Sequence, residues 1–171
     1  MTSAYDPSTV TAKDRELLRR CVNLAREALD AGDEPFGSLL VDDHDTVRFA
    51  DRNRVAGGDA TRHPEFAIAR WAAAHLTPEQ RRASTVYTSG EHCPMCSAAH
   101  AWVGLGRIVY AASTEQLTGW RKDWGFEPTG PVAPLPITVV APGTPVAGPE
   151  PALTAEIRSL HARMLGIDTT D

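Results

Sequence analysis

The first regular feature of the chain is a run of apolar residues at helical spacing between residues 13 and 31. Gly32 stops this run, as expected for a residue just past the end of a helix. The pattern predicts an amphipathic helix. Cys21 lies on its apolar stripe, and we interpret it as ordinary core because a free cysteine behaves as a small buried hydrophobe. The apolar positions are Leu17, Leu18, Cys21, Val22, Leu24, Ala25, Ala28 and Leu29.

A β-hairpin is predicted next. Residues 37–41 form a short apolar run that ends in the turn-forming residues 42–45, and residues 47–53 follow as a partner strand. Residues 57–59, with the sequence Gly-Gly-Asp, then indicate a flexible loop. The pattern therefore places an antiparallel strand pair directly after the first helix.

Helices and strands alternate through the middle of the chain. We expect helices over residues 64–76 and 94–103, and strands over residues 86–88 and 107–111. Strands that alternate with helices of about this length are typical of an α/β fold with a partly parallel central sheet.

The pattern is weaker after Ser113. Residues 114–130 predict a short helix and a loop, residues 136–141 a last strand, and residues 153–165 a final helix. Residues 141–151, APGTPVAGPEP, form a connector rich in proline and glycine. No internal repeat is present.

Length and composition narrow the class of protein. The 171 residues fit one domain, so we expect residues 1–171 to form a single domain with a loosely held polar tail at 1–10. A content of 42% hydrophobic and 23% charged residues is that of an ordinary soluble globular protein. The net charge of −5 disfavours nucleic acid as a partner, because such binding is dominated by cationic contacts with phosphate.

The number of cysteines and the length of the apolar runs indicate the cellular compartment of the protein. Three cysteines are too few, and odd in number, for a secreted disulfide framework. The first residues lack the cationic and apolar regions of a signal peptide, and no stretch approaches the roughly 20 apolar residues that span a bilayer. We therefore expect a soluble, cytoplasmic protein without a membrane partner.

Two short motifs carry the candidate chemistry. One is His63-Pro64-Glu65, and the other is Cys93-Pro94-Met95-Cys96, which begins 30 residues after His63. Zinc prefers imidazole nitrogen and thiolate sulfur in a tetrahedral arrangement. Two cysteines three residues apart at the start of a helix present both sulfurs to one ion, and the helix dipole favours their thiolates. We predict that His63, Cys93 and Cys96 bind Zn²⁺.

A site with three protein ligands is typical of catalytic zinc. The fourth position is left for water, whose pKa zinc lowers to about 7. Glu65 is two residues from His63, near enough to face that water without binding the metal. We predict that it is the catalytic acid and base, which carries a proton from the water to the substrate ring and then to departing ammonia. Pro64 suits the first turn of a helix.

The sequence disfavours two other interpretations of the cysteine pair. A redox pair would require a thioredoxin-like context, which the sequence lacks. A structural zinc site would require a fourth ligand nearby, but His92 is adjacent to Cys93 and His100 falls a turn further along the helix. The order and separation of the two motifs together favour the catalytic interpretation.

The motifs resemble those of the cytidine deaminase-like superfamily, in which H-x-E is followed by P-C-x-x-C. Within it, the chain is most similar to the branch of guanine, cytosine and tRNA-adenosine deaminases. The resemblance covers residues 13–113. It includes Pro35-Phe36-Gly37-Ser38, the Asn53 of an Arg-Asn-Arg segment, Tyr87-Thr88-Ser89-Gly90-Glu91 and Arg107-Ile108-Val109-Tyr110-Ala111.

The resemblance implies a three-layer α/β/α sandwich around a central five-stranded mixed sheet. It also implies a homodimer, and a substrate heterocycle that is hydrogen-bonded by Asn53. The alternative for Asn53 is a turn residue that ends the second strand. His92 stands where the family usually has proline, and its imidazole is a candidate pocket residue.

Aromatic residues are candidates for stacking on the substrate. Phe36 is one, and the resemblance implies that a C-terminal segment, here within 114–171, closes the pocket as a lid followed by a final helix. Ordinary core or loop packing is the alternative for each of these side chains. The lid candidates are Trp120, Trp124, Phe126 and Glu127.

Three functions compete. The first is hydrolytic deamination of a free base such as guanine, or of a related aminopyrimidine or aminotriazine, and the acidic charge suits a small neutral ligand. The second is tRNA adenosine deamination, which requires cations around the pocket mouth; the final helix offers only Arg158 and Arg163. The third is a zinc-bearing scaffold without activity, whose clearest sign would be loss of the glutamate, but Glu65 is present.

Overall fold

Five strands form one mixed sheet in the order β2-β1-β3-β4-β5. The computed structural model of the chain describes residue 6, residues 8–127 and residues 130–168. β1 pairs antiparallel with β2 and β3, whereas β3, β4 and β5 are mutually parallel neighbours. The strands are β1 (Gly37–Val41), β2 (Val47–Arg52), β3 (Thr85–Gly90), β4 (Arg107–Ala112) and β5 (Val146–Ala147).

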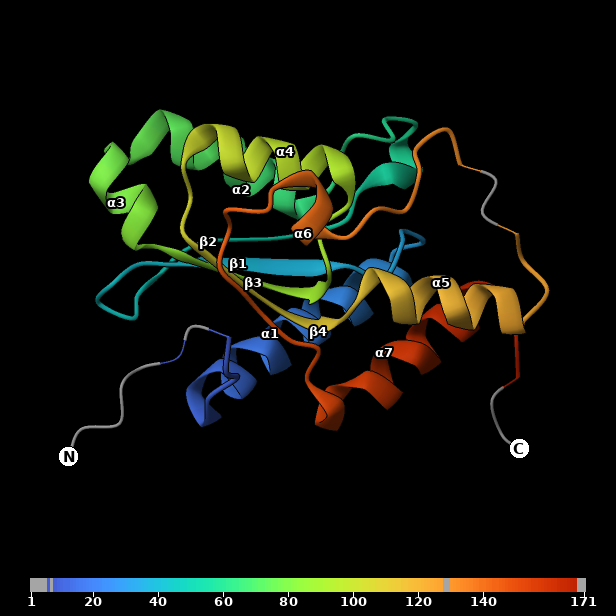
Figure 1. Cartoon of the computed structure of the whole chain (residues 1–171). Helices are drawn as coiled ribbons and strands as arrows, with labels where there is room; N and C mark the ends of the chain where they lie inside the picture. The colour runs from blue at the N-terminus through green and yellow to red at the C-terminus, as the bar shows by residue number, and fades with distance from the viewer. Residues whose placement is uncertain (1–5, 7, 128–129, 169–171) are drawn as a thin grey trace.

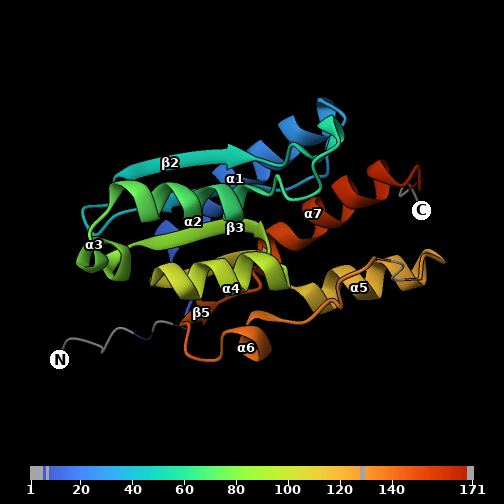
Figure 2. The ribbon, with the colours of Figure 1, turned by 90° about the horizontal axis from the view of Figure 1, so that it is seen from above.

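Helices cover both faces of this sheet, which gives the predicted α/β/α layers (Figure 1). α1 and α7 lie on one face, and α2, α3, α4 and α6 lie on the other; Figure 2 shows the second group from above. The helices are α1 (Ala12–Asp30), α2 (Pro64–His75), α3 (Pro78–Ala83), α4 (Pro94–Val103), α5 (Thr114–Asp123), α6 (Ile137–Val140) and α7 (Pro151–Met164), with a 3-10 turn at Val55–Gly57.

Each face of the sheet buries its own apolar cluster. On the α1 and α7 face, Leu18, Val22 and Ile157 pack against the strands, because the apolar stripe of α1 recurs at helical spacing. On the opposite face, Ile68 of α2 and Ile137 of α6 belong to a second apolar cluster, together with buried side chains of β1, β3 and β4. Every residue of β1 is buried, as expected for a strand covered on both sides.

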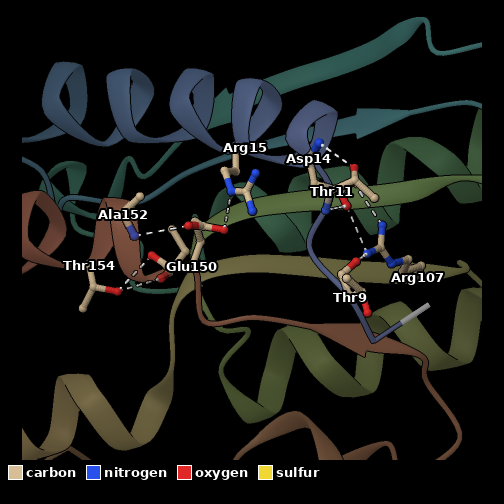
Figure 3. Close-up of polar contacts among 9 residues, drawn as sticks. Thr9, Thr11, Asp14, Arg15, Arg107, Glu150, Ala152 and Thr154 are labelled. Carbon is tan, nitrogen blue, oxygen red and sulfur yellow. Dashed lines mark hydrogen bonds and ion pairs between the residues drawn. The ribbon is translucent and has the colours of Figure 1, made fainter. Parts of the chain in front are cut away.

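A polar network fastens the start of α1 to the sheet (Figure 3). Thr11 and Asp14 form a capping box at the helix N-terminus. The Asp14 carboxylate also accepts hydrogen bonds from the Tyr87 hydroxyl (2.8 Å) and from Arg107 (3.1 Å). Nearby, Arg15 of α1 pairs with Glu150 at 3.0 Å, which ties α1 to the beginning of α7.

The predicted strand at residues 136–141 is wrong: residues 137–140 form the helical turn α6. β-branched residues favoured a strand, but the Ile137 N–H donates to Glu91 (2.8 Å) and its side chain is fully buried against the α2 and α4 layer. The fifth strand is instead β5, within the predicted connector, where the Ile108 N–H donates to the Pro145 carbonyl at 2.9 Å.

Other elements follow the predicted pattern closely, with one helix added. α3 was not predicted; it is a short helix of six residues that begins at Pro78 and is capped by Thr77. Residues 1–5 and 7 of the predicted tail lie outside the described residues. In the part of the chain that the structure describes, no helix is long and apolar enough to cross a membrane.

Candidate metal and catalytic site

Two helix N-termini bring the predicted ligands together. His63 is the N-cap residue of α2 and Cys93 is the N-cap residue of α4, and each is followed by a proline at the first helical position. Proline there sets the backbone for the helix and leaves no hydrogen bond unmade. α2 and α4 lie side by side (Figures 1 and 2), so both motifs face the same point.

The three predicted ligand atoms have the spacing of a tetrahedral zinc site. His63 Nδ1 lies 3.6 Å from Cys93 Sγ and 3.7 Å from Cys96 Sγ, and all three atoms lie within 4.8 Å of one another. A tetrahedral ion with Zn–S of about 2.3 Å and Zn–N of about 2.0–2.1 Å places sulfur and nitrogen about 3.6 Å apart. The donor set therefore fits Zn²⁺, as predicted.

The environment of Cys93 favours its thiolate. The neighbouring Cys96 thiol donates to its sulfur and His63 lies beside it, and together they lower the pKa of the Cys93 thiol to about 4. The start of α4 adds the positive end of a helix dipole. A deprotonated sulfur is the form that binds a metal ion.

Glu65 is held by two buried hydroxyl groups. Ser38 Oγ of β1 and Thr88 Oγ1 of β3 each lie 2.8 Å from Glu65 Oε1. The second carboxylate oxygen, Oε2, lies 3.8 Å from Cys96 Sγ, so the acid faces the metal ligands without belonging to them. Burial raises the pKa of the Glu65 carboxyl above its ordinary value.

A cavity of about 200 Å³ opens directly beside His63, Glu65 and Cys93. The carboxyl ends of the parallel strands β3 and β4 form part of its wall, as is general for ligand sites in α/β sheets. α5, α7 and the segment 132–134 close the other side. The lining residues away from the metal ligands include Phe36, Glu91, Leu117, Trp120, Arg121, Val132, Pro134, Ile157 and His161.

Two of the predicted substrate-binding residues line this cavity. Trp120 extends from α5, and Phe36 precedes β1. The Phe36 ring meets the imidazole of His161 edge-on, with ring centroids 5.1 Å apart. Gly90 leaves room for this ring, since a Cβ atom there would lie 2.7 Å from Phe36.

The remaining predicted residues lie outside the cavity lining. Asn53 is fully buried; its Oδ1 accepts from the Val55 N–H, and its Nδ2 has no partner among the described residues. His92 is buried against His100, with ring centroids 5.4 Å apart, instead of facing the cavity. Trp124 lies under the guanidinium of Arg158, 5.4 Å from it. The lid candidates Phe126 and Glu127 are exposed and also lie outside the lining.

Sequence reasoning missed several polar residues of the cavity. His161 falls four residues after Ile157, on the buried stripe of α7, so a histidine among apolar positions was a usable signal. Arg121 directly follows the predicted Trp120 and carried no signal of its own. Glu91 accepts backbone N–H groups of Thr114 (2.7 Å) and Ile137 (2.8 Å), which joins three segments that are distant in sequence.

Comparison with known proteins supports a zinc site in this part of the chain. Residues 11–112 match the protein family described as the cytidine and deoxycytidylate deaminase zinc-binding region. A probable cytosine deaminase of Schizosaccharomyces pombe is 38% identical over 111 residues, which are 63% of this chain and 65% of that protein. The guanine deaminase of Bacillus subtilis is 36% identical over 96 residues, 56% of this chain and 62% of that protein.

The matched region thus spans a little less than two thirds of the length of these curated relatives. Among solved structures, a guanine deaminase from Nitrosomonas europaea superposes with a TM-score of 0.65 at 22% identity. The superposition covers 90% of this chain and 86% of that one, so the likeness of fold extends beyond residue 112 into the C-terminal helices.

Proposed function

The chain belongs to the family of the cytidine and deoxycytidylate deaminase zinc-binding region, and from this premise we propose that it deaminates a free nucleobase-like heterocycle by hydrolysis. The substrate class is guanine or a related aminopyrimidine or aminotriazine. The observation that carries the proposal is Glu65, a buried carboxylate that lines the cavity beside three zinc ligands without being one of them.

The reaction replaces a ring amino group with oxygen: water adds at the amino-bearing carbon, the C–N bond breaks, and ammonia leaves. Zinc, when bound by His63, Cys93 and Cys96, supplies the Lewis acid that activates the water. Glu65 accepts the water's proton, delivers it to the ring nitrogen, and carries the second proton to the leaving amino group. Ser38 and Thr88 keep its carboxylate oriented throughout.

The size of the cavity supports a bare ring as substrate. Its volume of about 200 Å³ is below the roughly 300–1,000 Å³ of pockets that hold drug-sized ligands. Phe36 and Trp120 supply flat apolar walls on which a heterocycle can stack. Asn53 lies outside the cavity lining, but its Nδ2 donor is unpaired among the described residues, so we keep it as a candidate for a polar contact with the ring.

We further propose that residues 1–171 work as one domain in a cytoplasmic homodimer, and that residues 114–171 close the pocket. Trp120 and His161, which both line the cavity, support the closing role. A cytoplasmic location agrees with the reduced thiols that the zinc site requires.

A second candidate is deamination of adenosine in tRNA, and one observation favours it. A separate hollow on the other side of His63 is lined by Arg54, Arg62 and Arg70, which could contact phosphate groups. Asp51 and Asp59 line the same hollow and offset part of this charge, and Arg54 pairs with Asp51 at 3.1 Å. We therefore rank this candidate below free-base deamination.

The experiment is ammonia release from a panel of amino-heterocycles by the zinc-loaded protein. The panel contains guanine, cytosine, adenine, isoguanine, ammeline, their available nucleosides and a tRNA anticodon stem-loop. We expect ammonia from a free base, and a fall of at least about 10²-fold in kcat for Glu65→Gln, because general acid–base catalysis contributes about 10²–10⁴-fold. Zinc content should stay at one ion per chain.

Glu16→Gln, an exposed change on α1, is the matched control and should keep full activity. Ammonia from the stem-loop alone would favour the second candidate. Silence across the panel with zinc bound would favour a scaffold without activity.

A further inference from the structure

One cation in the cavity has no counter-ion among the residues that the structure describes. Arg121 of α5 lines the cavity, is half-buried, and forms no ion pair or side-chain hydrogen bond with any of the described residues. Its Nε–H is fully buried and finds no acceptor in the described part of the chain. A buried donor without an acceptor costs about 1–3 kcal/mol, and more when the group is charged.

The carboxylates of the cavity are already engaged elsewhere. Glu91 uses Oε1 for the Ile137 N–H and Oε2 for the Thr114 N–H. Glu65 is held by Ser38 and Thr88 at the zinc ligands. Among the described residues, then, no carboxylate of the cavity wall pairs with Arg121, which leaves its guanidinium available to an acceptor on a ligand.

His161 of α7 is the second unpaired polar group on this wall. The side chain is 1% exposed, and its Nδ1 has no partner among the described residues. Burial, aided by the charge of Arg121, lowers the pKa of His161 to about 3, so the imidazole is neutral at physiological pH. The surroundings of the two groups are apolar, with Leu117, Val132 and Ile157 on the lining.

We propose that Arg121, with His161 beside it, donates a hydrogen bond to an oxo group on the substrate ring. The preferred substrates would then be heterocycles that carry one amino and one oxo group, and not those that carry two amino groups. The inference rests on the proposed function. A guanidinium only donates hydrogen bonds, whereas a ring carbonyl only accepts them. An amino group in place of the oxo group would offer Arg121 no acceptor at that position and would place a second donor opposite it.

The test compares rings that carry an oxo group in one member and an amino group in the other, a change that also takes the proton off the adjacent ring nitrogen. Cytosine is paired with 2,4-diaminopyrimidine and guanine with 2,6-diaminopurine, and kcat/KM for ammonia release is measured for each. In the wild-type protein we expect the oxo member of the accepted pair to be favoured about 10- to 100-fold, the worth of a hydrogen bond to a charged group. In Arg121→Met this ratio should fall toward one, with zinc content unchanged.

Arg158→Met is the matched control. It removes a cation from neighbouring α7 that stacks on Trp124 outside the cavity lining, and it should keep the wild-type ratio. If circular dichroism shows that Arg121→Met does not fold, Arg121→Gln replaces it. A ratio unchanged by loss of the guanidinium, or a wild-type preference for the diamino ring, overturns the inference even when deamination is established.

Calorimetric binding of the same four compounds separates this inference from the proposed function. If no compound is deaminated, the proposed function fails, and the inference then stands or falls on the affinity ratio within each pair. A wild-type ratio above about tenfold that is lost in Arg121→Met supports it. Equal affinities, or no binding of any of the four compounds, overturn it.

Discussion

At the scale of single residues, the hydroxyl hydrogens around Glu65 determine which hydrogen bonds its carboxylate can accept. Ser38 Oγ and Thr88 Oγ1 each carry one hydrogen, and both lie 2.8 Å from the same carboxylate oxygen. Thr88 Oγ1 also lies 2.8 Å from the Gly90 carbonyl, and the two hydroxyls lie 3.0 Å apart. Both hydroxyls can therefore donate to Oε1 as long as that oxygen carries no proton, and Oε2 is left to take up and release a proton in the cavity.

Removal of either hydroxyl should slow the chemistry more than it weakens binding. For Ser38→Ala and Thr88→Val we expect kcat to fall about tenfold or more each, because each loses a hydrogen bond to a charged group. KM and zinc content should change little, and Thr88→Ser should restore most of the rate. Steady-state ammonia release on the accepted substrate measures both constants.

Ser84→Ala is the control for these variants. Ser84 is also buried, but its hydroxyl donates to the Gln80 carbonyl at 2.7 Å, away from the site. An unchanged kcat in Ser38→Ala and Thr88→Val would remove the two hydroxyls from the positioning of Glu65. An equal loss in Ser84→Ala would assign the effect to general destabilisation.

At the scale of elements, α1 is fastened to β3 and β4 by one buried ion pair. Arg107 and Asp14 are both nearly inaccessible, and the pair is completed by the Tyr87 hydroxyl and the Thr11 N–H. Burial opposes ionisation, but the hydrogen bonds from Arg107 prevail and hold the pKa of Asp14 below its ordinary value. The fold therefore relies on an ionised Asp14.

Loss of this carboxylate should destabilise the fold and change its response to acid. We expect Asp14→Asn to lower the free energy of unfolding by about 3–5 kcal/mol, since it leaves a buried guanidinium without its counter-ion. Because the pKa of Asp14 is lower in the folded chain, its stabilisation is complete above the ordinary value of about 3.9 and is lost as pH falls through the folded value.

Urea denaturation at pH 7 and across the acid range measures both effects. The wild-type protein should lose stability below about pH 4 more steeply than Asp14→Asn, which has no proton to gain at this position. Asp30→Asn is the control, because Asp30 is exposed and pairs with exposed Arg163. Equal stability of wild-type and Asp14→Asn would contradict the role of the ion pair.

The elements that the sequence predicted are the long periodic ones. α1, α2 and α4 bury one face each, so their apolar residues recur at helical spacing, and their ends are marked by residues such as Gly32 and Pro64. β5 has only two residues, too few for any period. At 137–140, burial against α4 outweighed the strand preference of β-branched side chains, which no local pattern records.

At the scale of the whole molecule, one wall of the cavity could be predicted from the sequence and the other could not. The zinc ligands and Glu65 come from two local motifs, and the residue types and spacing of these motifs are typical of a zinc deaminase. The opposite wall comes from α5, the segment 132–134 and α7, which only the folded chain brings together. Arg121 and His161 could not be paired from sequence for this reason. We therefore expect residues beyond the family match at 11–112 to contribute to substrate preference together with Phe36.

Assembly is the remaining whole-molecule prediction, and α4 offers the surface for it. Trp102 of α4 is 89% exposed, and Val139 of the adjacent α6 is 60% exposed. Exposed apolar side chains on neighbouring elements are typical of protein interfaces, where tryptophan often dominates the binding energy. We expect light scattering to give a mass of twice the 18.4 kDa chain, and Trp102→Lys to return it to a single chain.

Phe126→Lys is the matched control for this surface. Phe126 is 40% exposed but lies beyond α5, far along the chain from α4, so its change should leave the dimer intact. A wild-type mass of one chain would contradict the dimer. A dimer that survives Trp102→Lys would place the interface on another face. Because Cys93 caps the N-terminus of α4, a monomeric variant with full zinc content and altered kcat would show that assembly supports the catalytic site.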